Sequence, residues 1–329
     1  MLLFIVKRLL LMIPTLAVIS VISYIIIELP PGDYVTTYII QLTETGDVPD
    51  HVIENLRQQY GLNQPWYVRY WKWMTRFVTG DMGYSLAWHQ PVRDLIGARL
   101  LLSMMISFLS LMFTWVVAFP IGIYSAVRQY SFGDYFFTFT GFLGLAVPNF
   151  LLALILMYLA HKYLDTGIGG LFSKEYEGAP WSFGKFVDLL EHLAIPIIII
   201  GTAGTAGTIR VMRANLLDEL QKPYVMTARA KGLQYWKLVL RYPVRLALNP
   251  FISTVGWVLP SLIAGETIVS VVLSLPTAGP LFLQALLEED MYLAGSFVML
   301  AASLTVIGTL LSDILLAIID PRIRYEGAT

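Results

Sequence analysis

The sequence predicts an all-α membrane protein with about six transmembrane helices and a small helical cap outside the membrane. Of its 329 residues, 57% are hydrophobic and only 14% are charged, whereas soluble proteins carry about 25% charged residues. Six apolar runs are long enough to cross the hydrocarbon core, which takes about 20 helical residues. The chain has no cysteine, which excludes disulfides, zinc–thiolate sites and a cysteine nucleophile. A net charge of −1 gives no reason to expect nucleic acid as a partner.

The six apolar runs follow one another along the whole chain. They are Leu9–Leu29, Leu100–Val127, Tyr135–Ala160, Leu193–Met212, Leu246–Ser270 and Leu293–Ile319. The third is long enough to tilt in the bilayer, and the fourth is the shortest and is rich in glycine. Although Lys7 and Arg8 precede the first run, its apolar core is too long for a signal peptide and no cleavage site of small residues follows. We therefore expect it to remain as a span.

The positions of lysine and arginine predict that both termini lie in the cytosol. With the N-terminus inside, the inner basic residues are Lys7, Arg8, Arg128, Arg210, Arg213, Lys222, Arg229, Lys231, Lys237, Arg241, Arg245, Arg322 and Arg324. These are 13 of 22, which leaves 22 − 13 = 9 outside. The short loops Val127–Asp134 and Arg210–Arg245 are basic, whereas the opposite loop at Glu288–Asp290 is acidic.

This orientation divides the chain into four predicted parts. They are the N-terminal end with the first span (1–29), an external cap loop (30–99), a five-span core with a cytosolic loop at 213–245 (100–319), and a cytosolic tail (320–329). Apolar spacing in the cap predicts two amphipathic helices, about Val52–Tyr60 and Trp66–Met74, separated by a turn at Gly61–Pro65. Their Trp and Tyr residues could pack within the cap or lie at the membrane interface, and the nearby Arg and Lys residues favour packing.

The other external loop, His161–Glu191, is rich in glycine and is expected to be irregular with one short helix near Phe183–Leu190. Prolines fall within or beside the predicted spans, where they could kink helices or act as hinges. Gly201, Gly204 and Gly207 predict close helix packing, and their face could also line a translocation path. Glu266 is expected near the external end of the fifth span, with a side chain that is interfacial or paired to a helix end.

A short basic segment between the fourth and fifth spans is the most organised part of the predicted cytosolic side. Pro223 suits the first position of a helix, and Gly232 suits the left-handed position after a helix end. We therefore expect a two-turn helix over Tyr224–Lys231, and a second helix over Tyr235–Tyr242 that ends at Pro243. A lipid-binding anchor would explain the positive charge but not a capped helix whose small residues Ala228 and Ala230 permit close approach. This pattern favours docking of a partner protein, with Ala228 and Gly232 at the closest approach.

Five segments carry a resemblance to a known family. They are YGLNQPWYVRYWKW with TGDMGYSL (Tyr60–Trp73 and Thr79–Leu86), PVRDLIGARL (Pro91–Leu100), GLAVPNFLLAL (Gly144–Leu154), YVMTARAKGL (Tyr224–Leu233) and DPRIRYE (Asp320–Glu326). In this order they resemble the inner-membrane permease subunits of the oligopeptide, dipeptide and nickel class of ABC importers. The long external loop after the first span resembles the first of the two permease types in that class.

The resemblance implies the type I ABC importer permease fold in a bacterial inner membrane. It also implies a second homologous permease that completes the path, two cytosolic ATPases that bind ATP and Mg²⁺, and an external substrate-binding protein. This chain itself would hold no cofactor or metal. The substrate would be peptides or a similar small solute, oligosaccharides included. The implied ATPase-coupling residues are Tyr224, Thr227, Ala228, Arg229, Ala230, Lys231, Gly232 and Leu233.

Two segments depart from the family pattern. The importer loop generally opens with Glu-Ala-Ala, where this chain has Ala228-Arg229-Ala230, as the peptide class often does. The pattern E-T-x-F-x-x-P-G-x-G is replaced by the longer ETIVSVVLSLPTAG over Glu266–Gly279, which lacks the first glycine. The end of the fifth span is therefore not fixed by the resemblance.

Two other classes of protein are alternatives to a transport subunit. No Walker-type P-loop occurs, so energy would have to come from a partner. A stand-alone secondary transporter or channel would show internal repeats with paired broken helices and ionisable groups at mid-membrane. An intramembrane enzyme would need a catalytic constellation within the spans. Neither pattern is evident in the sequence.

Overall fold

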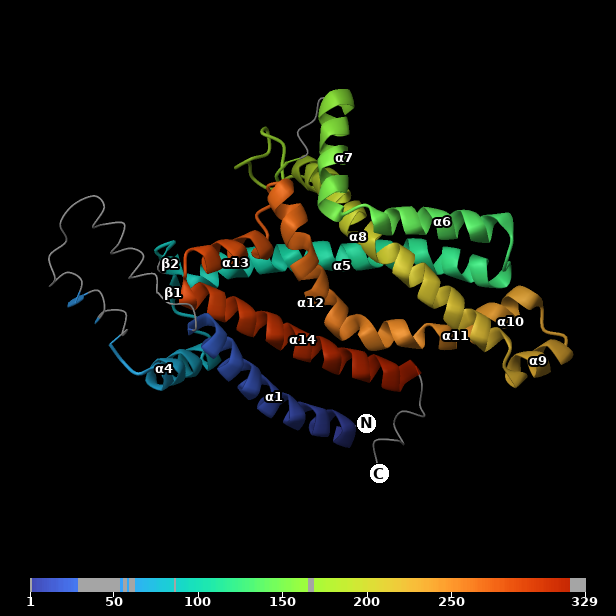
Figure 1. The fold of residues 1–329 in the computed structure, drawn as a ribbon, viewed down its shortest axis with the longest axis horizontal. Coiled ribbons are helices and arrows are strands. Elements are labelled where there is room, and N and C mark those ends of the chain that lie inside the picture. Colours follow the sequence, from blue (N-terminus) through green and yellow to red (C-terminus); the bar gives the residue numbers. More distant parts are fainter. Residues whose placement is uncertain are drawn as a thin grey trace. The chain divides into compact units, whose positions relative to one another are not determined.

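A computed structural model describes residues 2–28, 54–55, 58, 63–85, 87–164 and 169–319. The chain separates into two compact units, one of Met1–Leu102 with Ala278–Leu310 and one of Ser103–Thr277 with Leu311–Thr329. The described residues are almost entirely helical (Figure 1). They also include irregular stretches, such as residues 169–182, and a short antiparallel hairpin of β1 (Tyr84–Ser85) and β2 (Gln90–Pro91), which was not expected from the sequence.

The described helices overlap all six predicted apolar runs. They are α1 (Leu2–Glu28), α4 (Trp66–Val78), α5 (Val92–Val127), α6 (Phe132–Ala146), α7 (Asn149–Leu164), α8 (Phe183–Leu220), α9 (Pro223–Ala230), α10 (Tyr235–Arg241), α11 (Pro243–Ala247), α12 (Asn249–Val272), α13 (Ala278–Leu287) and α14 (Met291–Ile319). The C-terminal segment from Asp320, the first predicted cap helix apart from three residues, and residues 61–62 of the turn that follows it lie outside the described residues.

Four of the described helices are long and apolar enough to cross a membrane. They are α1 over Ile5–Ile25, α5, α8, and α14 over Met291–Leu316. They confirm four of the six predicted spans, and α12 covers the fifth predicted run over 24 residues. The all-α membrane fold is therefore confirmed, and the count of six stays a prediction.

The third predicted run is not one straight span. It forms α6 and α7, which are bent by 94° across a break. Pro148 lies at the break, and Val147 before it is extended at φ −91° and ψ 118°, as expected for a residue that precedes proline. By contrast, Pro120 and Pro196 lie inside the continuous helices α5 and α8. Of these three prolines, only the one at position 148 interrupts its helix.

The fourth predicted run was drawn too short. The short helix expected near Phe183 and the following span are one continuous helix, α8, of 38 residues. It begins where the Ser182 hydroxyl accepts a hydrogen bond from the Lys185 backbone N–H at 3.2 Å, a typical N-cap. At about 1.5 Å per residue, α8 is longer than the hydrocarbon core is thick, so it extends beyond the membrane.

Glycine lets α8 approach α5 closely. A Cβ atom on Gly201 would lie 2.5 Å from the Phe113 ring and 3.0 Å from the Ser110 carbonyl oxygen. The Thr114 hydroxyl donates to the Gly201 carbonyl across the same contact at 2.8 Å. Close packing is thus confirmed at Gly201, while a Cβ on Gly207 would meet nothing within 4 Å.

The end of α12 explains how the longer ETIVSVVLSLPTAG segment is accommodated. Ser274 takes the left-handed conformation at φ 53° that a glycine usually supplies. The Leu275 N–H donates to the Ser270 carbonyl at 2.8 Å, and the Ser274 N–H donates to the Val271 carbonyl at 3.2 Å.

Glu266 lies in the last part of α12 with no exposed surface, beside Ser103 and Ser107 of α5. The expected interfacial side chain is therefore wrong, because α5 covers it.

In the first unit, Asp290 joins the hairpin to the start of α14. Its carboxylate is fully buried and accepts hydrogen bonds from the Ser85 hydroxyl at 2.5 Å, the Ala87 N–H at 3.2 Å and the Leu293 N–H at 3.1 Å. The last of these caps α14. Part of the acidic loop that indicated the outer side therefore has a structural role.

Candidate functional site: the basic loop and its base

The predicted helix of the basic loop is confirmed as α9, which begins at Pro223 and ends at Ala230. Gly232 follows with φ +77°. The Gly232 N–H donates to the Arg229 carbonyl at 3.0 Å, and the Leu233 N–H donates to the Ala228 carbonyl at 3.4 Å. This pair of bonds is the Schellman motif, which closes a helix and redirects the chain at a fixed angle.

The second predicted helix is also confirmed, as α10 over Tyr235–Arg241. Pro243 ends it and at the same time begins a further turn, α11. Tyr242 between them has φ −116° and ψ −74°, away from ideal helical values. Three short helices therefore follow one another between the longer helices α8 and α12.

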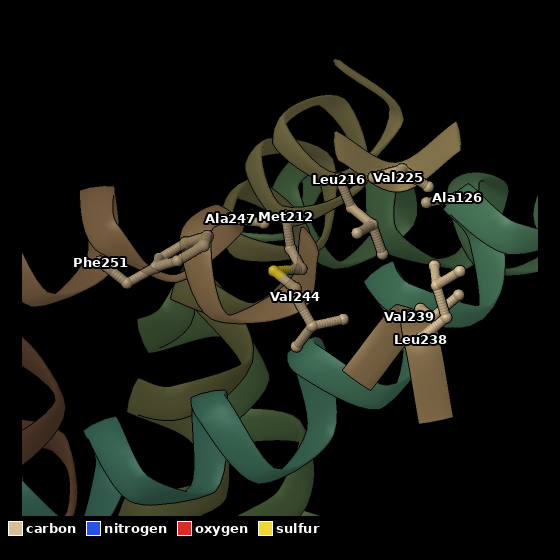
Figure 2. Close-up of a cluster of buried hydrophobic side chains, with 9 residues drawn as sticks. All are labelled: Ala126, Met212, Leu216, Val225, Leu238, Val239, Val244, Ala247 and Phe251. Atoms are coloured by element: carbon tan, nitrogen blue, oxygen red, sulfur yellow. The ribbon is translucent and has the colours of Figure 1, made fainter. Parts of the chain in front are cut away.

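A cluster of buried apolar side chains joins these three helices to α5, α8 and α12 within the second unit (Figure 2). Its members come from six helices, and each is at most 8% exposed: Ala126, Met212, Leu216, Val225, Leu238, Val239, Val244, Ala247 and Phe251. Burial of one such large apolar side chain contributes about 1.5–3 kcal/mol. The cluster, which we call the loop base, makes the basic loop a folded part of the core.

The predicted coupling residues divide between an inner and an outer side. Tyr224, Ala228 and Leu233 are partly buried and pack against the loop base. Thr227, Arg229, Ala230, Lys231 and Gly232 are exposed. The structure therefore favours Ala230 over Ala228 as the small residue open to a partner, because the Ala228 side chain already has neighbours within the chain.

Polar contacts hold α9 at both of its ends. The Tyr224 hydroxyl donates to the Glu219 carboxylate at 2.6 Å, which links α9 to the end of α8. Burial, together with this hydrogen bond, raises the pKa of the Tyr224 hydroxyl above its usual value near 10. The contribution of this hydrogen bond to the stability of the fold is therefore complete below about pH 10, and it is lost only as the pH rises further. At the other end, the Arg229 guanidinium lies 5.9 Å from the centre of the Tyr235 ring.

The outer surface of the loop is positively charged. Its exposed basic residues are Lys222, Arg229, Lys231, Lys237, Arg241 and Arg245, and the sequence has no acidic residue between Glu219 and Glu266. Exposed apolar side chains lie among them, with Met226 66%, Trp236 48% and Leu240 56% exposed. Sequence analysis missed these three. The spacing of Trp236 and Leu240, four residues apart and opposite the buried Leu238 and Val239, could have revealed a second apolar face on α10.

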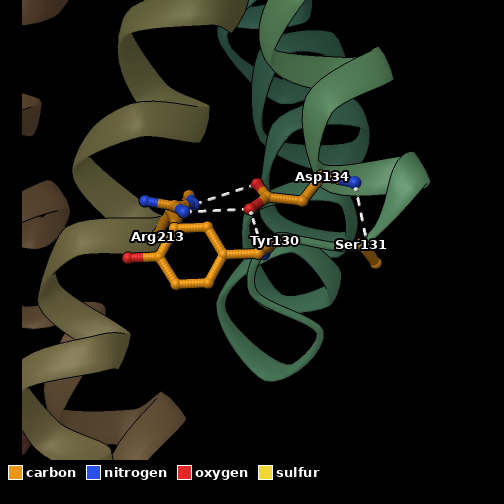
Figure 3. A network of polar contacts seen from close by, with 4 residues as sticks. All are labelled: Tyr130, Ser131, Asp134 and Arg213. Carbon is orange, nitrogen blue, oxygen red and sulfur yellow. Dashed lines mark hydrogen bonds and ion pairs between the residues drawn. The ribbon is translucent and has the colours of Figure 1, made fainter.

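A salt bridge beside the loop base was also missed (Figure 3). Asp134, at the start of α6, is 2% exposed and accepts from Arg213 Nε at 3.0 Å and from a terminal guanidinium nitrogen at 2.9 Å. It also accepts from the Tyr130 N–H at 3.0 Å, and its own N–H donates to the Ser131 hydroxyl at 3.3 Å. Arg213 directly follows Met212 of the loop base, so the pair fixes α6 to the part of α8 that carries the loop.

Replacement of Asp134 by asparagine should destabilise the protein. The substitution leaves the Arg213 guanidinium, whose side chain is 27% exposed, without its anionic partner. We expect a loss of roughly 2–3 kcal/mol, because partial exposure moderates the cost of an unpaired buried charge. Asp218→Asn on exposed α8 surface is the matched control and should change stability little. Thermal unfolding of the purified complex measures both, and equal effects would contradict the role given to Asp134.

Comparison with known proteins identifies the class. Residues 118–325 match the family described as "Binding-protein-dependent transport system inner membrane component", and residues 1–107 match "Binding-prot-dependent transport system membrane comp, N-term". The chain therefore belongs to the family of inner-membrane components of binding-protein-dependent transport systems. It is a multi-pass membrane transport subunit and not an enzyme.

Individual relatives are similar along their whole length. The oligopeptide transport system permease protein AppB of Bacillus subtilis is 36% identical over 98% of this chain and 99% of its own length. The oligopeptide permease protein OppB of Haemophilus influenzae is 31% identical over 99% and 100%. The dipeptide permease protein DppB of Escherichia coli K12 is 28% identical over 99% and 100%. The resemblance to ABC importer permeases is thereby confirmed, and the alternative of a stand-alone transporter or channel is not supported.

Proposed function

We propose that this chain forms half of the translocation path of an ATP-driven peptide importer. A second, homologous permease supplies the other half, two cytosolic ATPases bind ATP and Mg²⁺, and an external binding protein delivers the substrate. The names of three full-length relatives, two oligopeptide permeases and one dipeptide permease, support peptides as the substrate class. Residues 100–319 would form the permease core, 1–29 the first span, 30–99 the external cap and 320–329 the cytosolic tail.

We propose further that the outer side of the basic loop docks on one ATPase. The observation that carries this proposal is the combination of a rigid base and an open outer side. The loop base and the Schellman motif fix α9 in place, while the small residues Ala230 and Gly232 lie exposed at its end beside Arg229 and Lys231. A membrane anchor that only needed positive charge would gain nothing from this rigidity. Movement of the ATPase would instead be transmitted through the loop base to α8 and α12.

Reconstitution tests the substrate class. The complete transporter, with its binding protein, is placed in liposomes, and ATP hydrolysis is measured with dipeptides, longer peptides or oligosaccharides outside. We expect peptides to stimulate hydrolysis and to accumulate inside the liposomes, whereas oligosaccharides should do neither. Stimulation by oligosaccharides alone would overturn the peptide assignment and leave the transporter class intact.

The proposed orientation places the basic loop and both termini in the cytosol. Because the chain has no cysteine, single cysteines can report the side on which a residue lies. Glu175→Cys, in the external loop before α8, should react with a membrane-impermeant maleimide in spheroplasts. Gln221→Cys, beside the basic loop, should react only after the membrane is opened. Both residues are exposed, so the reverse pattern would contradict the orientation.

A further inference from the structure

Helix α4 of the external cap presents three different faces. Successive helical residues are turned by about 100°, which places Tyr70, Trp73 and Phe77 on one side. Tyr67, Trp71 and Val78 form a second side, and they are 53%, 63% and 75% exposed. The cations Lys72 and Arg76 form a third, also exposed. The centres of the three faces are separated by roughly 110–140° by this geometry.

The first face packs on the last turns of α1. Trp73 is only 5% exposed. The Tyr24 ring lies 5.4 Å from the Tyr70 ring and 5.8 Å from the Trp73 ring, between centres. The Tyr70 hydroxyl is hydrogen-bonded to the Ser20 hydroxyl at 2.8 Å, and Arg69 forms an ion pair with Glu28. The packing expected within the cap is therefore found, for this face, against the first span instead.

These contacts set the depth of α4 relative to the membrane. The apolar span of α1 covers 21 residues, Ile5–Ile25, or about 31 Å at 1.5 Å per residue. This length matches the hydrocarbon core of about 30 Å. Tyr24 therefore lies at the edge of the core, and Glu28 lies about 6 Å further out. Because α4 is attached to Ser20, Tyr24 and Glu28, it lies at the boundary between hydrocarbon and headgroups.

From this depth and the three faces we infer that α4 is an interfacial helix, inserted in the bilayer surface at the C-terminal end of α1. In the proposed orientation this is the outer leaflet. Tyr67, Trp71 and Val78 contact the upper acyl chains and glycerol region, where Trp and Tyr are favoured. Lys72, whose ammonium group donates to the Gln64 side chain at 2.7 Å, and Arg76 lie on the side that faces lipid phosphates. Within its span α1 also exposes apolar side chains, with Val18 58% and Ile22 51% exposed.

The absence of native cysteine permits a direct test by spin labelling. Trp71→Cys, Tyr67→Cys and Lys72→Cys are each labelled with a nitroxide in the complete transporter, held in phospholipid nanodiscs. Collisions with oxygen, which concentrates in the membrane, are compared with collisions with a water-soluble nickel chelate. Val18→Cys on α1 is the control for a residue in lipid. Spectra are recorded with and without the binding protein.

We expect the labels at positions 67 and 71 to collide several-fold more with oxygen than with the chelate, as at position 18, and the label at 72 to show the reverse. Addition of the binding protein should change none of these values. The inference is overturned if positions 67 and 71 are as accessible to the chelate as position 72, which would place the face in water. It is also overturned if both labels are shielded from both agents, with or without the binding protein, which would mean that a protein covers the face.

Discussion

Replacement of Leu238 by aspartate is expected to unfold the basic loop and release the ATPase from the membrane complex. Leu238 is 1% exposed in the loop base, between helices that carry the other apolar members. The substitution removes about as much packing as a Leu→Ala change, which costs about 2–5 kcal/mol, and it adds a carboxylate without a partner in an apolar site. This cost exceeds what three short helices can supply by themselves.

Leu240→Asp is the matched control for this experiment. It makes the same chemical change two residues further along α10, where the leucine is 56% exposed. Amide hydrogen exchange over residues 223–247 should become fast in Leu238→Asp and stay slow in Leu240→Asp. Both variants should reach the membrane in normal amount, because neither changes a span. Slow exchange in Leu238→Asp would mean that the loop does not depend on its base.

The second large effect concerns the backbone at Gly232. We expect Gly232→Val to weaken ATPase binding by roughly 5- to 30-fold and to reduce peptide uptake accordingly. At φ +77° a β-branched residue is strained by about 1–2 kcal/mol. To relieve this strain the chain would give up the Schellman motif that sets the end of α9. Within the chain a Cβ at this position meets nothing within 4 Å, so strain is the only internal cost.

Gly232→Asn separates the two possible reasons for glycine at this position. Asparagine tolerates the left-handed conformation, so it should preserve the fold of the loop. If glycine is needed only for its backbone conformation, the Gly232→Asn variant should transport peptide nearly as well as the native protein. If the ATPase approaches Gly232 closely, the same variant should fold normally and still lose ATPase binding. Normal transport by the Gly232→Val variant would show that coupling does not depend on glycine at this position.

Local signals made much of the fold predictable from sequence. The apolar runs identified the long helices because membrane spans need a minimum length of apolar chain. Pro223 and Gly232 defined α9 because proline is favoured at the first position of a helix and glycine at the left-handed position after its end. The 94° break at Pro148 was not predicted, since Pro120 and Pro196 lie inside unbroken helices and the sequence does not distinguish the three.

The parts that could not be predicted depend on contacts between distant residues. Ala228 and Ala230 look alike in sequence, and only the position of the loop base decides that Ala228 faces inward. The pairing of Asp134 with Arg213 joins residues 79 positions apart, and no local pattern marks either as the partner of the other. The burial of Glu266 likewise depends on α5, which is far away in the chain.

Photo-crosslinking from Ala230 tests the central claim most directly. A photoreactive amino acid replaces Ala230, at the exposed end of α9, or Leu287, which is 76% exposed in α13 and lies outside the cytosol in the proposed orientation. The assembled transporter is illuminated in membranes, and the crosslinked products are identified by mass spectrometry. The account predicts a product that joins position 230 to a cytosolic ATPase, and none from position 287. Crosslinks from position 230 to lipid alone, in a complex that retains its ATPases, would contradict docking through this loop.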